Sequence, residues 1–66
     1  MKYTYYKRNA DYAGNPSLYN IFRECDDGTR QLYRRRDDTW ANGKVNLEDL
    51  SKYHRVSEAE AFLELL

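Results

Sequence analysis

Few residues in this chain could carry out chemistry, and they are isolated in the sequence. His54 is the single histidine and Cys25 the single cysteine, and neither has a neighbour that would orient a general base beside a nucleophile. The segment 26–28 (Asp-Asp-Gly) begins like a calcium-binding loop, yet Arg30 stands where such a loop needs an oxygen ligand. We therefore expect a noncatalytic protein with no metal site and no cofactor.

An arginine run beside tyrosines is the pattern closest to a binding site. Positive charge and stacking rings together are typical of single-stranded nucleic-acid binding. The candidate residues for that function are Tyr3, Tyr5, Tyr33, Arg34, Arg35 and Arg36. Alternation along an extended strand would turn Arg35 away from its two neighbours, and the pI of about 6.6 is low for such a protein. Nucleic-acid binding is therefore the alternative function rather than the preferred one.

A β-hairpin over residues 18–36 would position these side chains. Residues 26–28 suit a three-residue loop in which Gly28 adopts a positive φ angle. This loop places Phe22 opposite Leu32 and Glu24 opposite Arg30, so apolar side chains meet each other and an acid meets a base. The two faces of the hairpin carry Tyr19, Ile21 and Tyr33 on one side and Leu18, Phe22 and Leu32 on the other.

The rest of the chain predicts one more strand and two helices. The first strand is tyrosine-rich and pairs with either strand of the hairpin. Asn42 and Gly43 indicate a turn after Trp40, a side chain that either fills the core or contacts a partner. Asn46 can cap a first helix, and Ser57 with Glu60 forms a capping box for a second. The apolar face of this second helix holds Ala59, Phe62, Leu63 and Leu66.

We therefore expect an α+β fold within a single domain, residues 1–66. Its three-stranded antiparallel sheet spans residues 2–7, 18–25 and 29–36 and packs against one or two short C-terminal helices, 46–54 and 58–66. Leu, Ile, Val and Phe together number only 12, so the seven tyrosines must supply part of the core.

Charge divides the chain although it cancels overall. Residues 1–36 hold eight basic and four acidic side chains, whereas residues 37–66 hold three basic and seven acidic ones. The division indicates either attraction within the molecule or a basic sheet surface for an anionic partner. The start of the chain has no apolar run typical of a signal peptide, and no stretch is apolar enough to span a membrane, so the expected location is the cytoplasm.

The preferred function follows from how much of the sheet the helices can cover. Both hairpin faces are half apolar, and the short helices can cover only one, so the other face or an edge strand is expected to bind another protein. The sequence predicts an adaptor or inhibitor whose candidate contact residues are Leu18, Phe22, Leu32, Arg34 and Arg36. A homodimer through the same surfaces is compatible with this function, and a membrane partner is not expected.

The order of several short motifs resembles a group of small tyrosine-rich proteins found in high-GC Gram-positive bacteria and their phages. The shared pattern is a GNP turn, a strand hairpin, a tryptophan, a leucine-containing spacer and a final S-E-x-E-A helix. The matching positions are Gly14, Asn15, Pro16, Tyr19, Ile21, Trp40, Leu47, Leu50, Ser57, Glu58, Glu60 and Ala61. The resemblance implies a bacterial or phage origin and brings no established activity. Asn20 departs from the basic residue usual at its position.

Overall fold

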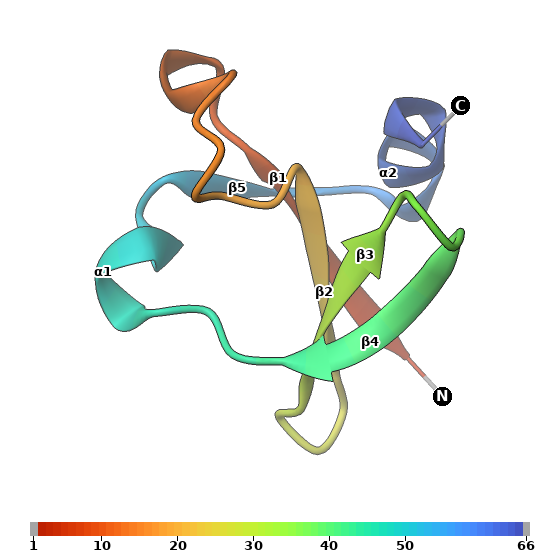
Figure 1. Ribbon diagram of the computed structural model, residues 1–66. Coiled ribbons are helices and arrows are strands. Elements are labelled where there is room, and N and C mark those ends of the chain that lie inside the picture. The colour runs from red at the N-terminus through yellow and green to blue at the C-terminus, as the bar shows by residue number, and fades with distance from the viewer. Residues whose placement is uncertain (1, 66) are drawn as a thin grey trace.

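The computed structural model describes residues 2–65 as one bent antiparallel sheet with short helical segments around it (Figure 1). The strands are β1 (Tyr3–Arg8), β2 (Ile21–Cys25), β3 (Arg30–Arg34), β4 (Thr39–Gly43) and β5 (Tyr53–Val56). The helical segments are the 3-10 turn η1 (Ala10–Tyr12), the single turn α1 (Leu47–Leu50) and α2 (Glu58–Glu64).

The sheet has five strands in the order β4-β3-β2-β1-β5, so the expected three-stranded sheet is wrong. The first four strands follow one another across the sheet, and β5 returns to pair with β1 on its free side. The additional strands come from residues 39–43 and 53–56, which the sequence assigns to a turn and to the end of a helix. The α+β class is correct at the coarser level.

The central hairpin has the register expected from its loop. Phe22 lies opposite Leu32, and Glu24 lies opposite Arg30 with their charged groups 3.2 Å apart. The Cys25 N–H donates to the Thr29 carbonyl at 2.8 Å, and Gly28 has a φ angle of 89°. Apolar pairing and turn chemistry therefore agree here, which is why the local prediction is confirmed.

Strand β4 occupies the segment in which a turn was expected. A turn over residues 35–38 comes first, with Asp38 at a φ angle of 55°, and it lets the chain double back along β3. Gly43 therefore belongs to the strand, where its missing side chain makes room for Leu32. A Cβ atom on Gly43 would lie 2.7 Å from Cδ1 of Leu32.

The expected helix over residues 46–54 is only the four-residue turn α1, followed by β5. The Asn46 side chain makes no capping hydrogen bond. Tyr53 and Val56 are both buried, and four residues of β5 pair with β1. Isolated short helices are marginal, so pairing with an open strand edge outweighs the helical preference of this segment.

Helix α2 begins as predicted and packs through Ala61 together with only part of the expected apolar face. The Ser57 hydroxyl accepts a hydrogen bond from the Glu60 N–H at 3.1 Å, as the capping box requires. Ala61 is fully buried, and Phe62, although 41% exposed, packs on the Tyr5 ring with centroids 5.6 Å apart. Leu63 is 67% exposed and Ala59 is also exposed, so the expected apolar face is only partly correct. The small Ala61 side chain lets the helix approach the sheet closely. Leu66 lies outside the described residues.

Both faces of the sheet are covered, which corrects the expectation that one would stay open. On one face, Ala61 from α2 packs in a cluster with Tyr5, Ile21 and Val56. On the other face, Leu18, Phe22, Leu32 and Tyr53 form a second buried cluster, with Val45 and Leu50 packed against it. The bend of the sheet and the chain around α1 supply the cover that helices alone could not.

Candidate protein-binding groove

An open groove of about 440 Å³ lies where three parts of the fold meet. Its walls are the approach to β2, the end of β3 with the following turn, and the C-terminal end of α2, which lies beside that turn (Figure 1). The lining residues are Leu18, Tyr19, Asn20, Ile21, Tyr33, Arg34, Arg35, Arg36, Glu64 and Leu65.

The first wall is the loop before β2, whose backbone accepts hydrogen bonds from the Arg8 and Tyr53 side chains. The Arg8 guanidinium donates from Nη1 to the carbonyls of Asn15 and Leu18, each at 3.0 Å. The buried Tyr53 hydroxyl donates to the Tyr19 carbonyl at 2.7 Å, and burial raises the pKa of that phenol above its ordinary value. These bonds fix the Tyr19 backbone and leave its ring 48% exposed at the groove.

The second wall carries the arginine run. Strand β3 ends at Arg34, so Arg35 and Arg36 belong to the turn and the expected split of the three across two strand faces does not apply. Arg34 pairs with Asp37 at 2.9 Å. Within residues 2–65, Arg35 and Arg36 are exposed and form no side-chain ion pair or hydrogen bond. The groove therefore presents two uncompensated guanidinium groups.

Tyr33 lies between the arginines and the aromatic part of the sheet. Its hydroxyl donates to the Asp38 carboxylate, and this hydrogen bond raises the pKa of the phenol. Its ring packs against Trp40 with centroids 5.4 Å apart. Trp40 is half-buried against the cluster of Tyr5 and Ile21, so most of its role is in packing. Asp38 and Trp40 therefore hold the Tyr33 side chain in place in this wall.

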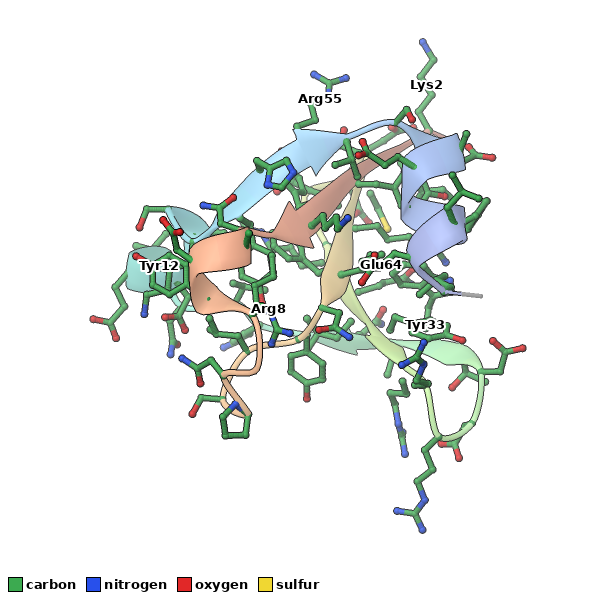
Figure 2. The ribbon with its side chains drawn as sticks, turned by 90° about the horizontal axis from the view of Figure 1, so that it is seen from above. Lys2, Arg8, Tyr12, Tyr33, Arg55 and Glu64 are labelled. Atoms are coloured by element: carbon green, nitrogen blue, oxygen red, sulfur yellow. The ribbon has the colours of Figure 1, made fainter. Side chains whose placement is uncertain are left out.

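The third wall is the last turn of α2. Glu64 pairs with Lys7 of β1 at 3.3 Å, which fixes the helix end on the sheet and partly neutralises this carboxylate. Leu65 is partly buried, and the exposed Phe62 and Leu63 lie one turn earlier on the helix. Figure 2 shows Tyr33 and Glu64 on the same side of the molecule, with Tyr12 on the other.

Only part of the predicted protein-binding set reaches this surface. Leu18, Phe22 and Leu32 are 8%, 1% and 9% exposed, because they form the core of the second cluster, and of these three only Leu18 also lines the groove. Arg34 and Arg36 do line the groove. Sequence reasoning missed Tyr19 and Glu64, which come from distant segments. The sequence pattern placed Tyr19 on a strand face with Ile21 and Tyr33, whereas in the structure β2 begins only at Ile21 and Tyr19 lies in the preceding loop.

The predicted nucleic-acid set is also divided. Tyr5 is only 4% exposed, and the Tyr3 ring packs on the Arg23 guanidinium with 3.9 Å between the ring centroid and Cζ. Arg23 has Trp40 on its other side at 4.2 Å. Tyr3 and Tyr5 are therefore engaged in internal packing, and of the three tyrosines in the predicted set only Tyr33 lines the groove with the three arginines.

The remaining chemical candidates do not meet. Cys25 pairs with Tyr3 at one end of β1, and His54 pairs with Lys7 near the other, which separates them by about 13 Å along the strand. The His54 ring lies instead against Asn9, with Nδ1 and Oδ1 2.6 Å apart. Within residues 2–65, no three His, Cys, Asp or Glu side chains are grouped for metal binding, and no helix has the length and apolarity to cross a membrane.

The groove thus combines exposed cationic and aromatic groups with partly buried aliphatic ones. No protein-family model, curated protein or solved structure matches the chain.

Proposed function

We propose that this chain is a small noncatalytic protein-binding module that holds a segment of another protein in the groove. The observation that carries the proposal is that Arg35 and Arg36, which have no ion pair within residues 2–65, line the same groove as the exposed Tyr19 ring. Arginine and tyrosine are enriched in protein interfaces and often dominate their binding energy. The hydrogen bonds behind Tyr19 reduce the ordering cost of binding.

The groove suits a partner segment with one or two carboxylates and an apolar side chain. A guanidinium binds a carboxylate through two parallel hydrogen bonds, which fixes orientation as well as adding energy. Leu65, which is partly buried, supplies aliphatic area at the α2 wall of the groove. The partner's acidic group would therefore lie over the turn and its apolar group toward α2.

A nucleic-acid strand fits this surface less well. Asp37 neutralises Arg34, Glu64 lies in the groove itself, and Asp38 adds a carboxylate to the same turn. Nonspecific binding to nucleic acids depends on many phosphate contacts, and two free arginines supply few. Local charge thus favours a protein segment over a polyanion.

The test is a charge reversal at the two free arginines. The partner is captured from native cell extract, purified, and titrated with the double variant Arg35→Glu and Arg36→Glu by calorimetry. The control is the double variant Lys2→Glu and Arg55→Glu, which makes the same charge change at two side chains that project into solvent away from the groove (Figure 2). We expect at least a tenfold weaker Kd for the groove variant and less than a twofold change for the control.

Two results would overturn the proposal. One is equal weakening by both double variants, which would indicate long-range charge attraction without a specific site. The other is binding of a labelled single-stranded oligonucleotide at low salt that the groove variant abolishes, with no protein captured. That second result would replace a protein partner with nucleic acid.

A further inference from the structure

The outer side of β4 is an open strand edge. β4 is the last strand in the sheet order and pairs only with β3. Within residues 2–65, no backbone hydrogen bond reaches it from any segment other than β3. The Cys25 N–H donates to the Thr29 carbonyl, so Thr29 directs its backbone groups toward β2. This direction alternates along β3, so Leu32 directs its N–H and C=O groups toward Ala41 of β4. Trp40 and Asn42 therefore direct their N–H and C=O groups outward.

This edge lacks the features that usually prevent strand addition. Exposed edges are typically protected by charged side chains, proline or a bulge. The five residues of β4, Thr-Trp-Ala-Asn-Gly, include neither a charge nor a proline. The opposite edge, β5, is shorter and carries Arg55 and His54. The two edges are thus unequal, and β4 is the one able to accept another strand.

We propose that a second copy of this chain adds its own β4 to β4 in antiparallel orientation, which joins the two sheets across a twofold axis at Ala41. This register places Trp40 of each copy opposite the partner's Asn42, and both residues have outward backbone groups. Two N–H and two C=O groups from each copy are then paired. The interface is separate from the groove and does not depend on the proposed function.

Charges beyond the strand ends select this register. Counting outward from the axis places Asp38 of each copy, in the turn just before β4, opposite the partner's Lys44. One carboxylate oxygen of Asp38 accepts from Tyr33, and the other is left for Lys44, so two attractive contacts form across the axis. Lys44 is exposed and has no ion pair within residues 2–65. A shift that pairs Trp40 with the partner's Trp40 would instead place Arg36 opposite the partner's Lys44, and like charges repel. Charge complementarity therefore favours the axis at Ala41.

The proposal is tested by measuring the mass in solution by sedimentation over a range of protein concentrations. We expect the mass to rise from 7.9 kDa toward twice that value as concentration increases. Asn42→Pro removes an N–H that points away from β3, so it should weaken the dimer at least tenfold. Asn42→Ala is its control, because both variants lose the hydrogen bond from Gln31 to the Asn42 side chain at 3.0 Å.

A charge exchange provides a second test that does not rely on proline. Lys44→Glu alone and Asp38→Lys alone should each weaken the dimer at least fivefold. An equimolar mixture of these two variants should recover it, because both contacts across the axis then join opposite charges. Arg55→Glu, at the β5 edge, should leave the mass unchanged.

Three results would overturn the proposal. The first is a mass of 7.9 kDa at every concentration up to millimolar. The second is a dimer that Arg55→Glu weakens while Lys44→Glu does not, which would assign the interface to β5. The third is a mixture of Lys44→Glu and Asp38→Lys that remains monomeric when each folds normally, which would exclude the register about Ala41.

Discussion

The Arg23 side chain offers the sharpest test of how this small fold is stabilised. Its guanidinium lies between the Tyr3 ring at 3.9 Å and the Trp40 ring at 4.2 Å, and its Nε donates to Gln31 at 2.7 Å. Arg23→Met keeps much of the apolar stem but removes all three contacts. The variant therefore isolates the contribution of the charged group.

The expected loss can be worked out contact by contact. A partly exposed cation over an aromatic ring contributes about 0.5–1 kcal/mol, and a hydrogen bond contributes about 0.5–1.5 kcal/mol. We therefore expect Arg23→Met to lower the free energy of unfolding by about 2 kcal/mol. With a urea dependence of about 1 kcal/mol per molar, typical of the smallest proteins, the unfolding midpoint falls by about 2 M. Trp40 fluorescence follows the transition.

Two comparisons make this reasoning refutable. Arg55→Met, on the solvent side of β5, should change the free energy of unfolding by less than about 0.5 kcal/mol. Arg23→Ala combined with Trp40→Leu should cost less than the two single changes added together, because each single change already removes their contact. If Arg23→Met is as stable as the unchanged protein, or if the two changes are additive, the stacked arrangement does not contribute to stability.

Three further outcomes are expected from the core and its tyrosines. Phe22→Ala should lower the free energy of unfolding by about 3–5 kcal/mol in urea titrations, since this ring is 1% exposed, and a loss under about 1 kcal/mol would contradict its place in the core. Gly43→Ala should cost about 1–3 kcal/mol by thermal or urea unfolding because its Cβ would meet Leu32, and an unchanged midpoint would show that Leu32 moves aside freely. Burial raises the pKa of Tyr53 above 10.0 in the folded state, so folding favours the protonated phenol. The stability that the protonated phenol contributes is complete below pH 10 and is lost as pH rises through the folded-state pKa. The difference between absorbance titrations of the protein and of Tyr53→Phe gives the folded-state pKa of Tyr53. A value at or below 10.0 would contradict the expected rise.

Local chemistry made the central hairpin and the start of α2 predictable. The loop with Gly28 and the pairing of Phe22 with Leu32 point to one register, and both signals lie within a few residues of each other. The Ser57 capping box likewise depends only on neighbouring residues. These predictions are confirmed because no distant contact competes with them.

The outer strands could not be predicted because their partners are distant in sequence. The segment from Tyr53 to Val56 looks like a helix end and becomes a strand only because β1 offers an open edge. Asn42 and Gly43 look like a turn, and the role of Gly43 appears only when Leu32 lies beside it. Nonlocal pairing overrides local preference in both segments.

The groove was half predictable for the same reason. Arg34 and Arg36 are recognisable from composition alone, and they do line the surface. Phe22 and Leu32 were assigned to a contact face because the bend of the sheet, which buries them, has no signature in the sequence. Tyr19 joins the arginines only through the fold.

Site-specific crosslinking tests most directly the claim that the groove is the contact surface. Tyr19 in the groove and Tyr12 on the 3-10 turn are tyrosines of similar exposure, 48% and 37%, so each can carry the same photoreactive phenylalanine. With the purified partner, we predict a crosslinked product from position 19 and none from position 12. Equal crosslinking at both positions, or crosslinking at position 12 alone, would contradict the account.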